Sequence, residues 1–297
     1  MAKAARRWTV EPRAANIHRI EIRLPHVGDE QRILLQSDVH EDNPHTDRDL
    51  LETHLDQADG FDAPVLDNGD WFCAMQGRWD PRANKDDLRP EHRTARYLDS
   101  LIETAAARYK RYQHLFTVRG KGNHETAILK RHETDLTERF VERLKAQGAK
   151  DVYTGGYAGW VVVNVIHGKN NEKPFKLHYH HGWGGGGPVT RGVIQTNRMA
   201  AYLADADIVF TGHTHDSWQM VIPRIRLNQD CTQVQHTRQT YVRVGGYKAE
   251  YRNGEGGWAV EKGMPPKPLG SAWVIFKHVP GHNGGRSYVD YDIVEAK

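Results

Sequence analysis

The sequence has few of the features expected of a secreted or membrane protein. Only two cysteines, Cys73 and Cys231, occur among 297 residues. Two thiols are too few for a disulfide framework or a cysteine-based zinc site, so a reducing compartment fits best. The longest apolar run, Trp160 to Ile166, is too short to span a bilayer. The basic start MAKAARRWTVEPRAANIH lacks the apolar core of a signal peptide. We therefore expect a soluble cytoplasmic protein.

A large excess of charge of either sign is also missing. Lysine and arginine total 41 against 38 acidic residues, a net charge of +3. This balance does not favour a polyanion-binding protein, and it leaves nucleic acid open as a partner. Basic residues of the 78–93 segment alternate with aspartates, which predicts a solvated loop. They are Arg78, Arg82, Lys85 and Arg89.

Histidine and glycine, in contrast, are abundant, with 18 and 28 residues. Glycine at this level implies many turns. Several histidines have charged neighbours in the sequence, and we predict that they are solvated surface residues. They are His18, His26, His45, His54, His92, His114 and His132.

The order of apolar patterns predicts an α/β protein. Short apolar runs predict strands at 32–37, 63–67 and 114–118, and helical spacing predicts helices at 46–58, 91–113 and about 125–147. This alternation implies a parallel sheet made of βαβ units. Later runs predict strands at 159–167, 174–181, 207–210, 218–226, 239–245, 271–278 and 287–294. We expect residues 1–30 to be an N-terminal extension packed on a single domain of residues 31–297, with two packed sheets and helices outside.

Polar residues follow the predicted strands at five places. The segments are SDVHEDN, DNGDWF, GKGNHET, HHGWGGGG and VFTGHTH, and in the last one Gly212 is expected to allow a sharp turn. Ligands bind at the carboxyl ends of strands in open α/β sheets, so the five segments predict one shared site. Each segment alone has a structural alternative, such as a helix cap, a turn or a surface histidine. Their joint occurrence at strand ends favours the site.

The residue types in these segments indicate metal chemistry. Imidazole, carboxylate and amide groups suit manganese, iron, zinc or nickel rather than calcium. Two ions roughly 3.5–4 Å apart need an anionic bridge, which the central Asp70 can supply. Such a pair lowers the pKa of a shared water toward neutrality and polarises the oxygens of a bound phosphate. The pattern therefore indicates hydrolysis of phosphoesters.

The ordered motifs resemble those of the calcineurin-like metallophosphoesterases. That family has Asp-x-His, Gly-Asp, Gly-Asn-His-Glu/Asp, a lone His and Gly-His-x-His, and this chain has DVH, GD, GNHE, HG and GHTH in the same order over residues 38–215. The resemblance implies a four-layer αββα sandwich of two mixed sheets flanked by helices. It also implies two divalent transition-metal ions, foremost manganese, with iron, zinc or nickel as alternatives. Three further segments resemble phosphoesterases of phage and bacterial genomes: GDWFCAMQGRWDPR, LRPE and EKGMPPKPLG. If a phage encodes the chain, the expected location is the cytoplasm of the host cell.

The resemblance also implies a role for each matching residue. The first metal would be held by Asp38, His40 and His215, the second by Asn123, His181 and His213, with Asp70 as the bridge. His124 would protonate the leaving oxygen, and Glu125 would orient that part of the site.

Other histidines could occupy the lone-histidine position. Alternation along a strand places His178 and His180 on the face opposite to His181. His181 precedes a glycine, as the family's histidine commonly does. His167 also precedes a glycine, but that glycine opens a predicted hairpin turn. We therefore assign the role to His181.

Departures from one branch of the family bear on the activity. In GDWFCAMQG, Cys73 stands where phosphoprotein phosphatases have a second aspartate, and the following arginine is absent. Phosphodiesterases and DNA-repair nucleases of the superfamily do end in Gly-His-x-His. The favoured hypothesis is therefore a metal-dependent phosphodiesterase acting on nucleotides or nucleic acid. The alternatives are a phosphomonoesterase or protein phosphatase, and a non-catalytic binding protein stabilised by its metals.

The glycine-rich segment HGWGGGGPVTRG, which begins at His181, suggests two substrate contacts. Trp183 is a candidate stacking wall for the substrate, and Arg191 is a candidate cation for a phosphate oxygen. The structural alternative is that Trp183 anchors the loop to the core and that Arg191 begins a surface helix.

Overall fold

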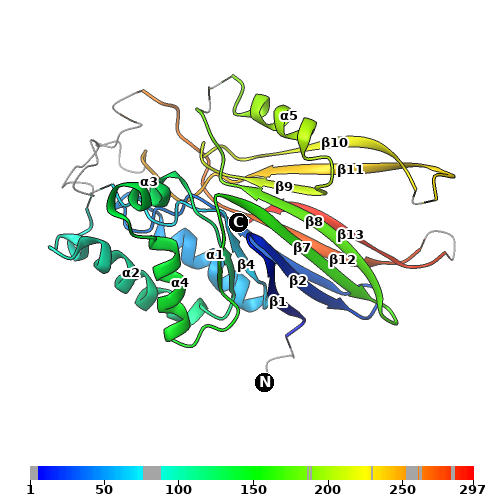
Figure 1. The fold of residues 1–297 in the computed structure, drawn as a ribbon, viewed down its shortest axis with the longest axis horizontal. Coiled ribbons are helices and arrows are strands. Elements are labelled where there is room, and N and C mark those ends of the chain that lie inside the picture. The colour runs from blue at the N-terminus through cyan, green and yellow to red at the C-terminus, as the bar shows by residue number, and fades with distance from the viewer. Residues whose placement is uncertain are drawn as a thin grey trace.

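The computed structural model describes residues 6–75, 88–185, 187, 189–228, 230–251, 260, 263–281 and 285–297. Within them, two mixed β-sheets face each other (Figure 1). One sheet has seven strands, in the spatial order β1 (Trp8–Ala14), β2 (Ile17–Leu24), β7 (Ala158–His167), β8 (Asn171–His180), β9 (Ile208–Thr211), β11 (Val234–Arg243) and β10 (Trp218–Leu227). The other has six, in the order β13 (Tyr288–Glu295), β12 (Ala272–Val279), β3 (Glu30–Gln36), β4 (Val65–Asp67), β5 (Phe116–Arg119) and β6 (Tyr153–Thr154).

Helices cover both outer faces, as Figure 1 shows, so the predicted αββα layering is confirmed. The six-stranded sheet is covered by α1 (Arg48–Gly60), α2 (Tyr97–Arg108), α3 (Asn123–His132) and α4 (Leu136–Ala146). The layer over the seven-stranded sheet is thin, and among the described residues it consists of α5 (Val193–Tyr202). Between the sheets lies a core of buried aliphatic and aromatic side chains that includes Ile20, Val163 and Phe210. No described helix has the length and apolar character that a membrane crossing requires.

Two predictions about local structure were wrong. The single helix expected over 125–147 is interrupted, because Glu133 adopts a left-handed φ of 52° and Asp135 caps a new helix by accepting from the Glu138 backbone N at 3.0 Å. His18, His54 and His92 are buried rather than solvated, because they lie on the inward faces of their elements. The predicted hairpins are confirmed, since β10 pairs with β11 and β12 with β13 in antiparallel register.

The first thirty residues contribute directly to the sheets. β1 and β2 pair with each other, and β2 runs parallel to β7, so this segment supplies two strands of the seven-stranded sheet. β3 begins at Glu30 and pairs with β4 and β12.

Candidate metal centre

The seven expected ligands lie where five strands end. β3, β4 and β5 are parallel neighbours in one sheet, and β8 and β9 are parallel neighbours in the other. The two sets of strand ends are tied together, because Asn68 Nδ2 donates to the carbonyl oxygens of His180 at 3.0 Å and Phe210 at 3.3 Å. Both sheets therefore contribute side chains to one site.

The first group of donor atoms consists of Asp38, His40 and His215. His40 Nε2 and His215 Nε2 are 3.3 Å apart, and His215 Nε2 is 3.3 Å from Asp38 Oδ1. Asp38 Oδ2 accepts from Ser37 Oγ at 2.6 Å and from the His213 backbone N at 2.9 Å. These two donors fix the carboxylate, so that Oδ1 faces the imidazoles.

The second group consists of Asp70, His181 and His213, together with Asn123. His181 Nε2 is 3.0 Å from Asp70 Oδ2. Asn123 Oδ1 is 2.8 Å from His213 Nδ1 and 3.2 Å from His181 Nε2. Asp70 Oδ1 accepts from the His124 backbone N at 3.0 Å, which leaves Oδ2 facing the histidines.

Several buried polar atoms of these groups fit a bound cation. His181 Nδ1 lies 3.1 Å from the Asn68 carbonyl oxygen, which can only accept, so Nδ1 holds a proton. In the neutral ring, Nε2 then turns a lone pair toward oxygens of Asp70 and Asn123. Asp38 Oδ1 is buried and has no hydrogen-bond donor among the described residues. Opposed lone pairs in a buried space call for a cation, and this set of nitrogen and oxygen donors suits a divalent transition metal.

The electrostatics of the site also favour positive charge. Burial disfavours the charged form of His181, but the carboxylates of Asp70 and Asp38 outweigh it and raise the pKa of His181 to about 10. Burial likewise opposes ionisation of both aspartates, yet the facing histidines hold the pKa of each carboxyl below its ordinary value. Burial, helped by His124, lowers the pKa of His40 well below its ordinary value, so this imidazole is neutral, the form that binds metals.

The backbone of the ligands is strained. Five of the seven have left-handed φ values: Asp38 54°, His40 49°, Asp70 53°, His213 72° and His215 54°. Each such residue costs roughly 1–3 kcal/mol, and strain of this kind clusters at functional sites.

The chain turns directly after β9, where the Thr214 backbone N donates to the Gly212 carbonyl oxygen at 2.9 Å, and Gly212 also allows a close approach to β3's end. Gly212 is absent from the glycines with positive φ, whereas the two histidines that follow it have left-handed backbones. A Cβ at Gly212 would overlap Ser37 Oγ and Asp38 Oδ2. The glycine therefore lets the strand end that bears His213 and His215 approach Asp38.

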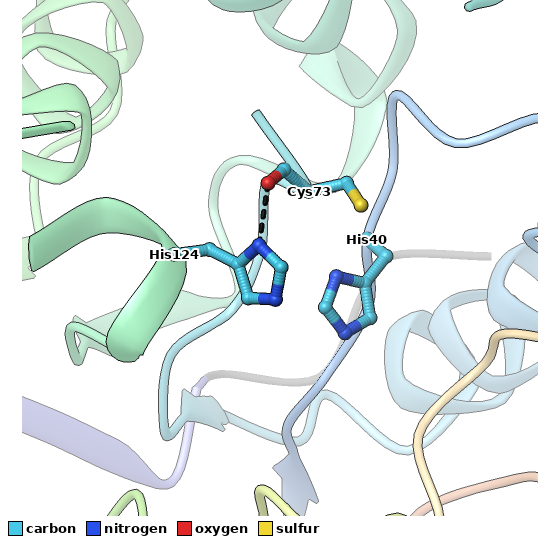
Figure 2. Close-up of side chains that lie close together, drawn as sticks. All are labelled: His40, Cys73 and His124. Atoms are coloured by element: carbon cyan, nitrogen blue, oxygen red, sulfur yellow. Dashed lines mark hydrogen bonds between the residues drawn. The ribbon is translucent and has the colours of Figure 1, made fainter. Parts of the chain in front are cut away.

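His124 lies beside the two groups and has a defined orientation. Its Nδ1 is 2.6 Å from the carbonyl oxygen of Cys73 (Figure 2), so Nδ1 must donate. Its Nε2 is 3.9 Å from Asp70 Oδ2. Nε2 is thus the nitrogen that can gain or lose a proton toward the site.

Glu125 holds the loop that bears Asp70. Its buried carboxylate accepts from the backbone N of Asp70 and Phe72, each at 3.0 Å, and from that of Gly122 at 2.9 Å. Burial, with Asp70 adding to it, raises the pKa of Glu125 to about 8. The last of these bonds also caps the N-terminus of α3, where Asn123 and His124 lie.

The other histidines of the HYHHG segment face away from the donor groups. The His178 ring packs against Trp160, with centroids 4.8 Å apart, and the His180 ring packs against Trp183 at 5.0 Å. His167 packs against His278 at 5.0 Å.

The two candidate substrate contacts lie on the outer side of the seven-stranded sheet. Trp183 is half-buried and packs on the apolar cluster beneath α5. Arg191 has an exposed side chain, while its carbonyl oxygen accepts from Trp218 Nε1 at 2.9 Å. Of the basic residues noted in the 78–93 segment, Arg78, Arg82 and Lys85 lie outside the described residues, and Arg89 Nη2 donates to the Thr46 carbonyl oxygen at 3.1 Å.

The sequence did not single out three residues that support the site. Ser37 and Asn68 fix Asp38 and His181 through the bonds described above. Asp42 accepts from the backbone N of Cys73 at 2.5 Å and of Ala74 at 2.9 Å. All three stand in or beside the strand-end motifs, so a small polar residue next to an expected ligand was the available clue.

Comparisons with known proteins gave structural likenesses, all those described below being weak. No family profile and no curated protein sequence matches the chain. A conserved protein of Streptococcus pneumoniae, described as a predicted phosphoesterase, is 14% identical with a TM-score of 0.32, over 89% of this chain and 99% of that one. The calcineurin-like phosphoesterase YfkN of Bacillus subtilis is 13% identical with a TM-score of 0.35, over 90% of this chain and 91% of that one.

Proposed function

We propose that this protein is a dinuclear-metal-dependent phosphoesterase, and more narrowly a phosphodiesterase acting on nucleotides or nucleic acid. The observation that supports it most is the pair of donor groups, Asp38–His40–His215 and Asp70–His181–His213, which lie side by side at the strand ends and are buried except for the half-buried His213 and His215. Asn123 would complete the second group, and Asp70 would supply the carboxylate shared by the two ions. The donor chemistry favours manganese, with iron, zinc or nickel as alternatives.

Bound metals would supply a nucleophilic water of lowered pKa and polarise the phosphoryl oxygens. The side chains of the protein perform the remaining tasks. His124, whose Nδ1 is held by the Cys73 carbonyl oxygen, delivers the Nε2 proton to the leaving oxygen. Glu125 fixes the positions of Asp70 and His124 relative to each other, because its carboxylate accepts from backbone N–H groups both after β4 and at the start of α3.

His124 also distinguishes catalysis from a purely structural metal site. It belongs to neither group that would hold the two ions, yet the Cys73 carbonyl oxygen orients it toward Asp70. A binding protein stabilised by its metals has no need of an oriented proton donor. The Gly-His-x-His ending favours diesters over monoesters through the family resemblance.

A substrate panel tests the proposal. Purified protein is given nitrophenyl diester and monoester, cyclic nucleotides, and single- and double-stranded nucleic acid, each with manganese and with chelator. We expect metal-dependent turnover of diesters that exceeds that of monoesters. Turnover of monoesters alone would overturn the narrower proposal, and no metal-dependent turnover with any substrate would overturn the broader one.

A further inference from the structure

A third group of donor atoms lies beside the proposed centre. It shares His40 with the first group, and its other two members are not among the seven proposed ligands. It consists of His40, Cys73 and His124, whose ligand atoms all lie within 4.8 Å of one another. Figure 2 shows a ring nitrogen of His40 facing the ring of His124, with the sulfur of Cys73 on the side of the His40 ring and the Cys73 carbonyl oxygen toward His124.

His40 presents its two nitrogens to different neighbours. Nε2 faces His215 at 3.3 Å and belongs to the first group. Nδ1 is buried, in a residue that is 2% exposed, and has no hydrogen-bond partner among the described residues. A histidine that binds a metal usually donates its second N–H to a carboxylate, a carbonyl or water. In His40 this second nitrogen, Nδ1, has no such partner among the described residues and lies near Cys73 and His124.

The other two members also have free lone pairs. Because Nδ1 of His124 donates to the Cys73 carbonyl oxygen, Nε2 of the neutral ring is an acceptor. Among the described residues, the hydrogen bond to Cys73 Sγ comes from Asn43 Nδ2 at 3.6 Å, which leaves the sulfur a further lone pair. The three atoms are therefore two nitrogens and one sulfur, the donor set of zinc-type sites rather than of manganese.

We propose that His40, Cys73 and His124 form a third position that binds a soft divalent ion, Zn²⁺ or Cd²⁺, when that ion exceeds what the centre holds. Two nitrogen–metal bonds and one sulfur–metal bond form, while the thiol proton of Cys73 and the Nδ1 proton of His40 pass to solvent. His40 then bridges the third ion and the first group. Bonds of about 2.0–2.3 Å require the three side chains to move together on binding.

Occupation of this position would inhibit the enzyme. The ion takes the Nε2 lone pair of His124, and this ring can then no longer deliver a proton to the leaving oxygen. This consequence rests on the proposed function, whereas the binding of the ion does not.

Absorption spectroscopy tests the binding. Full-length protein saturated with Mn²⁺ is titrated with Cd²⁺, and the thiolate-to-cadmium charge-transfer band is followed in the ultraviolet. We expect one equivalent of this band in the wild type and in Cys231→Ser, the matched control with the exposed cysteine removed. We expect no band in Cys73→Ser, and at least tenfold weaker cadmium binding in His124→Ala. A band that is lost in Cys231→Ser and kept in Cys73→Ser, or no band in the wild type, would overturn the proposal.

Inhibition tests the consequence separately. With a poor leaving group, excess Zn²⁺ should lower the turnover of the wild type and Cys231→Ser at least tenfold and leave Cys73→Ser almost unaffected. Equal inhibition of Cys73→Ser would show that the ion acts elsewhere. If no phosphoester is turned over at all, the proposed function fails, and the cadmium band still decides whether the third position exists. Should Cys73→Ser unfold, Cys73→Ala serves in both measurements.

Discussion

Two sets of buried histidines in this protein differ in what their nitrogens face. At the strand ends, His181 Nε2 faces the Asp70 carboxylate, and that charge outweighs burial and raises the pKa of the ring. Behind the six-stranded sheet, His54 is equally buried at 0% exposure, but its Nδ1 faces the Tyr247 hydroxyl at 2.9 Å. With no carboxylate to oppose it, burial lowers the pKa of His54 to about 4. Burial alone therefore does not indicate a metal ligand, whereas burial combined with a facing carboxylate does.

The largest effect, on metal affinity, is expected from Asp70→Asn. This change removes the carboxylate charge that distinguishes His181 at the strand ends from the core residue His54. Both ions should lose affinity, because the amide cannot supply a shared anionic oxygen. Metal analysis after dialysis measures the occupancy, with Asp292→Asn, a surface residue paired with Lys277, as the control. Retention of both ions at wild-type affinity would refute the bridging assignment.

A smaller effect is expected from His124→Ala, which leaves all seven proposed ligands in place. Turnover of substrates with poor leaving groups should fall roughly 10²–10⁴-fold, the usual contribution of a positioned general acid. Nitrophenyl substrates should lose much less, because nitrophenolate leaves without a proton. Metal content should match that of the wild type and of the control His114→Ala, a half-exposed histidine bonded to Asp59. Equal losses for both substrate types would assign His124 to phosphate binding or structure.

The core histidine should affect stability without affecting metal binding. His54→Ala removes a buried ring and its bond to Tyr247, and we expect a loss of about 2 kcal/mol in the free energy of unfolding at pH 7. Denaturant titration measures the loss, and metal content should be unchanged. A loss of bound metal would abolish the distinction between the two sets of histidines.

The pH dependence of the stability of His54→Ala tests the same comparison. The pKa of His54 is about 4 in the folded state and about 6.5 in the unfolded state, so the unfolded chain binds more protons between these values. This contribution to stability is complete above about pH 6.5 and is lost as the pH falls toward 4. The free energy of unfolding should consequently fall less steeply over this range in His54→Ala than in the wild type. Parallel slopes would show that another group titrates.

The smallest effect is expected at Trp183, which we propose as a wall for the non-phosphate part of the substrate. Trp183→Ala should raise the Michaelis constant for nucleotide diesters about fivefold, near the lower limit for a stacked base, because the ring is half-buried. The constant for a small nitrophenyl diester should not change. Trp160→Ala, which alters the same outer face at His178, is the control. A large fall in melting temperature with unchanged kinetics would show that Trp183 is a packing residue. It would also argue against the proposed contact of Arg191 with a phosphate oxygen.

Local sequence patterns were sufficient for much of the fold. Apolar runs predicted β7, β8, β10 and β12, because a strand's alternation and its turn are encoded within about ten residues. The break between α3 and α4 was missed, although Asp135 followed by Glu138 is a helix-start pattern. The apolar periodicity continues across the break, and for this reason the pattern predicted one helix and gave no sign of the N-cap at Asp135.

The sequence by itself determined which residue types stand at the ends of five strands, and with them the chemistry of the site. Only the tertiary structure decided which atoms face one another. Asp38 meets the backbone of His213 across 175 positions, and His54 meets Tyr247 across 193. Such contacts depend on how two sheets pack and on side-chain rotation, which no local pattern encodes. For the same reason, only the folded chain shows that His40 Nδ1, which the third position requires, has no hydrogen-bond partner within the described part of the chain.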